Sequence, residues 1–98
     1  MEFSYKIYNE SEELLLAIAD SAILGKTFEE GDLILTVSEF YQGDKCDKSK
    51  AISLIKDATI INAVGKDIID LLKQEDIIDK NFILKINGIP HAQVILVK

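Results

Sequence analysis

The C-terminal stretch from Phe82 to Lys98, FILKINGIPHAQVILVK, decides the fold that we predict for this chain. It contains two runs of residues that favour strands, one at 82–86 and one at 92–97. The segment between them, NGIPH, includes the only proline and the only histidine of the sequence. Two strand-forming runs joined by a short segment that contains glycine are typical of a β-hairpin.

The residues of this turn also indicate that it is rigid. Asn87 and Gly88 both accept a positive φ at low steric cost, as a two-residue hairpin turn requires. Pro90 fixes its own φ and favours an extended conformation for Ile89. We therefore expect His91 to be held in a fixed pose at the edge of a sheet.

Length and composition predict one soluble globular domain over residues 1–98. The chain has 98 residues, of which 48% are hydrophobic and 29% charged, a balance typical of folded proteins. No apolar run approaches the roughly 20 residues that cross a bilayer, so we expect no association with membranes. The N-terminus MEFSYKIYNE lacks the basic start and the apolar stretch of a signal peptide. These features predict a cytoplasmic protein.

The charge of the chain limits the partners that it can bind. The formal net charge is −6, from 17 acidic and 11 basic residues. The lysines within 45–56 are interleaved with acidic residues and form no basic stripe. Because non-specific binding to nucleic acid requires clustered Lys and Arg, we do not expect it. Docking onto a protein within a larger assembly stays open.

Three strands are predicted in the first half of the chain. Residues 3–8 alternate between apolar and polar side chains, which indicates a half-buried strand. The apolar run LLLAIA at 14–19 fits either a central strand or part of a helix, and its place after a short polar break favours the strand. A helical turn capped by Asp20 and ended by Gly25 should follow. The third strand is predicted at 33–37.

Two helices are predicted in the second half. The first begins at Asp47 or Ser49, and its apolar residues recur with the helical period: Ala51, Leu54, Ile55 and Ala58. The second covers 66–75, and we interpret 59–65 as a tight buried connection or a short extra turn. The order of elements predicts an α+β fold, a mostly antiparallel sheet of about five strands with two helices packed on one face.

No sequence motif meets the requirements of a cofactor or metal site. Gly25-Lys26-Thr27 matches the end of a phosphate-binding loop, but Asp20 occupies the position of its first glycine and no long helix follows. The acidic residues within 44–57 lack the spacing of a calcium loop. One histidine and one cysteine are too few for a transition-metal site. We therefore expect neither a cofactor nor a metal.

Two side chains are candidates for binding or chemistry. His91 has an ordinary pKa near neutrality, although a lone histidine beside a proline most often has a structural role. Ligand or partner binding is its second interpretation, and acid–base catalysis the third. Asn62 lies in an apolar segment where its amide needs hydrogen-bond partners, and anchoring the turn at Gly65 is its simplest role. No recognisable set of Ser, His and acid is present, which favours a protein that is not an enzyme.

Three segments together resemble the archaeal family catalogued as domain of unknown function 424. They are ILGKTFEEG at 23–31, ATIINAVG at 58–65 and NGIPHAQ at 87–93. The similarity covers nearly the whole chain, and the Thr-x-x-Asn-x-x-Gly and Gly-x-Pro-His-Ala-Gln pieces are more specific together than singly. The resemblance implies an archaeal cytoplasmic protein and supplies no established activity.

Two positions depart from the pattern of that family. Many members have Gly-Gly where this chain has Asn87-Gly88. Many also carry a cysteine before the acidic residue that matches Asp20, and here that residue is Ala19. The second departure speaks against a cysteine-based chemistry in this protein.

The leading hypothesis is a non-catalytic interaction module for a protein or ribonucleoprotein partner. Its recognition surface would combine His91, Pro90 and Asn87 with Asn62 and Thr59. The reason is a rigid polar turn on an acidic domain that lacks a catalytic set.

Two alternatives stay open. In the first, the protein is a small-ligand binder or an enzyme, and His91 and Asn62 line one pocket with Thr27 or Asp20. In the second, it is a structural subunit whose residues 92–97 form an unpaired apolar edge and pair with a second copy.

Overall fold

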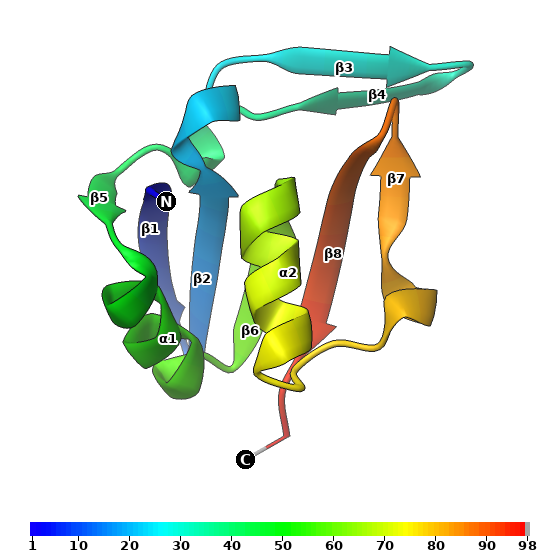
Figure 1. Ribbon diagram of the computed structural model, residues 1–98. Helices are drawn as coiled ribbons and strands as arrows, with labels where there is room; N and C mark the ends of the chain where they lie inside the picture. Colours follow the sequence, from blue (N-terminus) through cyan, green and yellow to red (C-terminus); the bar gives the residue numbers. More distant parts are fainter. Residues whose placement is uncertain (98) are drawn as a thin grey trace.

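The structure is a computed structural model that describes residues 1–97; Lys98, the end of the predicted hairpin, lies outside the described residues. The described residues form eight strands, two α-helices and three 3-10 turns (Figure 1). In chain order the elements are β1 (Phe3–Glu10), β2 (Glu13–Asp20), η1 (Ser21–Ile23), β3 (Thr27–Glu30), β4 (Leu33–Thr36), η2 (Glu39–Tyr41), β5 (Asp44–Cys46), α1 (Lys48–Asp57), β6 (Ile60–Val64), α2 (Lys66–Gln74), η3 (Lys80–Phe82), β7 (Leu84–Ile86) and β8 (Ile89–Ile95).

Six strands form one sheet in the order β5-β1-β2-β6-β8-β7, and β3 and β4 form a separate hairpin. Neighbours in the large sheet are antiparallel, except that β2 and β6 are parallel. Two parallel strands need a long crossover, and here it contains β3, β4, η2, β5 and α1. Figure 1 shows the β3–β4 hairpin lying across one end of the sheet.

The α+β class and the two helices on one face are as predicted, but the prediction of about five strands is not exact. The segment 59–65, which we interpreted as a connection, contains the central strand β6. Both faces of β6 are covered, with Ile61 and Ala63 in the core on the helix side and Val64 in the core on the other. A strand that is covered on both faces shows little alternation between apolar and polar residues. The period of two residues that indicates a half-buried strand was therefore absent from this segment. The strand predicted at 33–37 exists as β4, but it belongs to the separate hairpin.

The helices bury the larger core against one face of the sheet. α1 begins after Asp47, one of the two predicted caps, whose carboxylate accepts the N–H of Lys50 at 2.9 Å. The buried residues on this side are Phe3, Leu16, Ile18, Ala51, Leu54, Ile55, Ala58, Ile61, Ala63, Ile68, Ile69, Leu71, Leu72 and Ala92. Within the described part of the chain, no helix is long and apolar enough to cross a bilayer.

The opposite face of the sheet, called the back face below, is covered by the segment 33–42 instead of a helix. The second core cluster lies there and comprises Ala17, Ala19, Leu35, Val37, Tyr41, Val64 and Ile86. Ala17 and Ala19 are fully buried in β2. Their small side chains allow the covering segment to pack close to the sheet.

The C-terminal hairpin is present. Its two-residue turn has positive φ at both positions, 51° at Asn87 and 79° at Gly88, as a type I′ turn requires. The second strand begins earlier than predicted, so that Pro90 and His91 lie inside β8. The expectation that His91 lies at the edge of the sheet is therefore wrong. β8 is the penultimate strand, and His91 is opposite Val64 on one side and opposite Leu84 on the other.

Asp20 does not cap the turn that follows it. The turn η1 forms and Gly25 has a φ of 85°, but the side chain of Asp20 makes no capping bond there. Its two carboxylate oxygens instead accept the N–H groups of Asp67 and Ile68, each at 2.9 Å. Asp20 thus caps α2 from the end of β2, because the residue at the N-cap position of α2 is Gly65, which has no side chain.

Candidate functional site

The amide of Asn62 lies at the centre of a hydrogen-bonded cluster on the back face. Its Oδ1 accepts a hydrogen bond of 2.6 Å from the hydroxyl of Tyr41 and lies 3.0 Å from Nε2 of His91. We call Asn62, Tyr41 and His91 the Asn62 cluster. His91 and Asn62 are therefore neighbours, as the pocket alternative requires.

Sheet register places these side chains together. β6 and β8 pair with Val64 opposite His91 and Asn62 opposite Gln93, so Asn62 and His91 are diagonal neighbours. Tyr41 reaches them from η2, and its main-chain oxygen accepts a hydrogen bond of 2.8 Å from the hydroxyl of Ser4. Three segments far apart in sequence thus meet at one amide.

The Asn62 cluster is neutral at pH 7. Because Oδ1 of Asn62 is an acceptor, Nε2 of His91 carries the proton between them. Burial lowers the pKa of His91 below its usual 6.5, which keeps the ring uncharged. Burial also raises the pKa of Tyr41 to about 12, so that its hydroxyl stays a donor. The cluster therefore presents hydrogen-bond donors and acceptors without a net charge.

Two polar atoms of the Asn62 cluster are available to a ligand. Among the described residues, none hydrogen-bonds Nδ1 of His91 or the amide nitrogen of Asn62. Within residues 1–97, every buried side-chain nitrogen or oxygen has a partner, so these two atoms are in contact with solvent. The cluster therefore displays one acceptor and one donor side by side.

A groove of about 360 Å³ lies next to the Asn62 cluster. We call it the acidic groove, and it is lined by Tyr8, Glu10, Ser11, Glu13, Leu15, Phe40 and Ile60. The rings of Tyr8 and Phe40 stack with centroids 5.0 Å apart, and the Tyr8 hydroxyl donates to the Phe40 carbonyl at 2.9 Å. Ile60 and Phe40 place the groove beside the cluster, since Ile60 precedes Asn62 by two positions on β6 and Phe40 precedes Tyr41.

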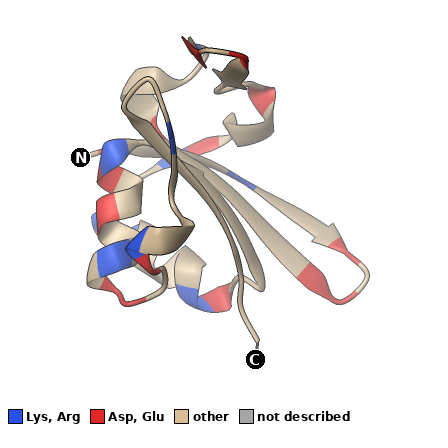
Figure 2. Ribbon diagram, turned by 90° about the vertical axis from the view of Figure 1, so that its right-hand side faces the viewer, with Lys and Arg blue, Asp and Glu red and all other residues tan. Residues whose placement is uncertain are grey.

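The rim of the acidic groove is negatively charged. Glu10 and Glu13 are exposed and lie directly opposite each other in the pairing of β1 with β2. Glu12 lies in the turn between them, and Figure 2 shows these acidic positions in red at the tip of the β1–β2 hairpin. Like charges opposite each other repel, and a cation placed between them relieves this repulsion.

The structure does not bring the other predicted candidates to the Asn62 cluster. Asn87 lies in the turn, where its N–H donates to the carboxylate of Glu30 at 2.7 Å and so joins two hairpins. Pro90 is buried, and its carbonyl accepts the N–H of Gly65 at 2.9 Å. Thr27 lies on the β3–β4 hairpin.

Thr59 occupies a position beside the acidic groove. Its hydroxyl accepts the N–H of Leu14 at 2.8 Å and donates to the carboxylate of Glu13 at 2.6 Å. These bonds tie the start of β6 to the start of β2. Thr59 thus has a structural role and also orients one carboxylate of the rim.

Sequence reasoning missed Tyr41 and most residues of the acidic groove. The only available signal was the amide of Asn62, which required a donor that the sequence did not identify. Tyr8, Phe40 and Glu10 come from segments whose proximity depends on the crossover between β2 and β6. No local pattern indicates that contact.

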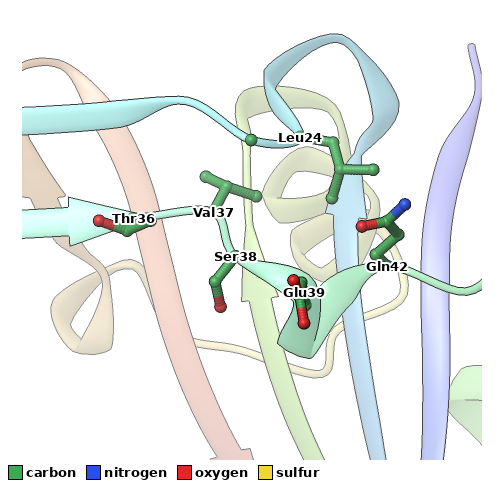
Figure 3. A pocket seen from close by; sticks show the side chains of 7 residues that line it. Leu24, Thr36, Val37, Ser38, Glu39 and Gln42 are labelled. Atoms are coloured by element: carbon green, nitrogen blue, oxygen red, sulfur yellow. The ribbon is translucent and has the colours of Figure 1, made fainter.

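A larger hollow, of about 600 Å³, lies elsewhere, between η1 and the segment 36–42 (Figure 3). It is lined by Leu24, Gly25, Thr36, Val37, Ser38, Glu39 and Gln42. It contains none of the predicted site residues, although the hydroxyl of Thr27 lies 3.2 Å from that of Thr36. Within residues 1–97 no three His, Cys, Asp or Glu side chains are grouped as metal ligands.

Comparison with solved structures identifies the same fold in another protein. A crystal structure of an uncharacterized conserved protein from Methanopyrus kandleri matches with a TM-score of 0.82 and 22% sequence identity, covering 100% of this chain and 96% of that chain. A search of curated proteins gave no match. The family model described as protein of unknown function (DUF424) matches residues 8–97. The chain therefore belongs to this family, as the three sequence segments had suggested.

Proposed function

We propose that the protein is a non-catalytic interaction module that binds a basic segment of a partner protein at the acidic groove. The observation that supports this most is an apolar groove with two opposed carboxylates on its rim, Glu10 and Glu13. A lysine or arginine buries its aliphatic stem against apolar surface and keeps its charged end near carboxylates. The groove provides both features at one place.

The Asn62 cluster supports binding of an extended segment beside that side chain. Nδ1 of His91 is an acceptor and the amide nitrogen of Asn62 is a donor, and neither has a partner within the described chain. A peptide main chain carries one donor and one acceptor per residue, so it matches this pair. The predicted recognition residues His91 and Asn62 thus keep a role, whereas Asn87 and Pro90 support the fold.

The charge of the chain supports the proposed class of partner. Blocks of basic residues are typical of protein arms that bind nucleic acid, so a protein component of a ribonucleoprotein belongs to this class. The net charge of −6 attracts such arms and repels free phosphate backbones. A cytoplasmic location is part of the same proposal.

The experiment selects random heptapeptides against the purified protein and then measures binding of the enriched peptides by calorimetry. We expect enrichment of Lys or Arg next to apolar residues. Combining Glu10→Gln with Glu13→Gln should weaken binding by about tenfold or more, or about 1.4 kcal/mol. Glu12→Gln combined with Glu29→Gln is the matched control, since it also removes two charges and neither residue lines the groove.

Two results would contradict the proposal. The first is enrichment of peptides without a basic residue. The second is equal weakening by the combined Glu12→Gln and Glu29→Gln variant, which would mean that only the net charge matters. A separate His91→Ala variant tests the main-chain contact, because it removes the exposed acceptor while leaving the rim unchanged.

The second candidate function is binding of a small ligand at the Asn62 cluster. The contact of 3.0 Å between His91 and Asn62 favours it, because the pocket alternative predicted that these residues meet. Screening a fragment library by ¹H–¹⁵N spectra tests it. Shifts confined to Asn62, His91 and Tyr41 would favour a small ligand, whereas shifts confined to the acidic groove would argue against it.

A further inference from the structure

The outer side of β8 is an open strand edge. Leu96 donates its N–H to Thr59 and Pro90 accepts from Gly65, so the main-chain groups of the even-numbered residues of β8 point toward β6. In an antiparallel strand the alternate residues point the other way, which directs the N–H and C=O groups of Gln93 and Ile95 away from β6.

No strand covers these groups within residues 1–97. β7 begins only at Leu84, which is opposite His91, so residues 92–95 have a strand neighbour only on the side of β6. Figure 1 shows the part of β8 beyond β7 running without a strand on the side that faces away from β6. A groove of about 390 Å³ lies along this edge, lined by Ile77, Ile78, Asp79, Phe82, Gln93, Val94 and Ile95.

Most of the exposed side chains around this edge are apolar, and the exceptions are Gln93 on the strand and Asp79 in the groove. Ile95 is 70% exposed, Val97 98%, Phe82 74% and Leu84 51%. The sequence from 86 to 97 has no charged residue, and Figure 2 shows no charge colour along the chain leading to the C mark. Natural sheets usually protect an open edge with charges, prolines or bulges, and residues 92–97 have none of the first two.

We propose that this edge pairs with the same edge of a second copy, antiparallel and about a two-fold axis. With Ile95 opposite Ile95 of the second copy, Gln93 lies opposite Val97, and all three positions present outward main-chain groups. A two-fold contact is self-complementary, so the free donors and acceptors of one edge match those of the other. The pairing residues 92–97 are uncharged, so no like charges oppose one another within the strand pair itself, and the acidic side chain of Asp79 lines the groove beside it.

The contact would be small. A strand pair with its flanking Phe82 and Leu84 falls in the class of interfaces below about 1,200 Å², which associate weakly. We therefore expect a monomer–dimer equilibrium with a Kd on the order of 100 μM. The carboxylates of the acidic groove, Glu10 and Glu13, belong to the β1–β2 hairpin, whereas the proposed contact uses the outer edge of β8; among the groove residues, Ile60 lies on β6 opposite Ile95.

Sedimentation equilibrium over about 10 μM to 1 mM tests the proposal, with hydrogen exchange of the Gln93 and Ile95 amides as the second readout. We expect dimerisation with rising concentration and slower exchange at these two amides. Ile95→Lys should weaken the dimer at least tenfold. Ile34→Lys is the control, because Ile34 is 66% exposed on the β3–β4 hairpin, and the variant should dimerise like the unchanged protein.

Three outcomes would overturn the proposal. One is that the protein is still a monomer at about 1 mM, which would mean that the edge of β8 pairs with an extended segment of another protein instead. The others are a dimer that Ile95→Lys leaves intact, and a dimer that Ile34→Lys weakens equally. Circular dichroism of both variants verifies that they are folded.

Discussion

The contact between Asp20 and Gly65 should contribute strongly to stability. Asp20 lies at the end of β2 and caps α2, because its carboxylate accepts hydrogen bonds of 2.9 Å from the N–H groups of Asp67 and Ile68. Asp20 precedes Asp67 by 47 residues in the sequence. Gly65 has a φ of 124° and a ψ of 153°, a backbone conformation that residues with a Cβ atom rarely adopt. A Cβ at this position would also collide with the carboxylate of Asp20. The perturbations are Asp20→Ala, Gly65→Ala and the double substitution.

The expected magnitudes follow from these two features. Asp20→Ala removes an N-cap, which costs about 1–2 kcal/mol of unfolding free energy. Gly65→Ala imposes backbone strain of about 1–3 kcal/mol and displaces the cap, which adds about 1 kcal/mol. In the double variant the collision is absent and the cap is already lost. The double variant should therefore be less destabilised than the sum of the single variants, by about 1 kcal/mol.

Chemical denaturation of the four proteins gives this coupling energy, provided that the dependence on denaturant is the same in each. Asp70→Asn is the control, because Asp70 is exposed on α2, and its effect should stay within about 0.5 kcal/mol. Additive effects of the two single substitutions would refute the reasoning, since they would mean that Gly65 is required only for its backbone conformation. If Gly65→Ala left the unfolding free energy unchanged, the predicted backbone strain at this position would be refuted as well.

Two further predictions concern the Asn62 cluster. Because burial lowers the pKa of His91, the folded protein binds fewer protons than the unfolded chain below pH 6.5, so the unfolding free energy should fall as pH decreases from about 7 to 5. The ring protons should titrate below 6.5 by NMR, and His91→Gln should lack this part of the pH dependence; a midpoint at or above 6.5 would contradict the prediction. Tyr41→Phe removes the donor to Asn62 and should cost about 1 kcal/mol, whereas Tyr5→Phe, whose hydroxyl makes no hydrogen bond with a described residue, should cost less. Absorbance should show one tyrosine that ionises only near pH 12, and its loss in Tyr41→Phe would identify it.

Local signals explain the parts of the fold that could be predicted. The Asn87-Gly88 turn, the cap at Asp47 and the apolar period of α2 each depend on residues within a few positions of one another. The conformational preferences that produce these features do not depend on the rest of the chain. The helices were therefore predicted nearly at their observed bounds, and the C-terminal hairpin was predicted with its turn in place but with its second strand beginning three residues too late.

Long-range pairing explains the parts that were missed. β6 is a strand because it lies between β2 and β8, and its parallel pairing with β2 depends on a crossover of some 40 residues. Asp20 was likewise predicted to cap the helical turn that follows it directly in the sequence. Only the register of Gly65 against Asp20 shows that it caps α2 instead.

The three segments that identify the family mark junctions of the fold. Asn87 bonds Glu30, Pro90 bonds Gly65, and His91 contacts Asn62, so each pair joins two of these segments. Residues that hold strands together in this way are constrained whether or not they bind a ligand. Most of the acidic groove lies outside all three segments, on β1, β2 and η2. Apart from Ile60, Asn62 and His91, the residues that reveal the family therefore differ from those that we propose to bind a partner.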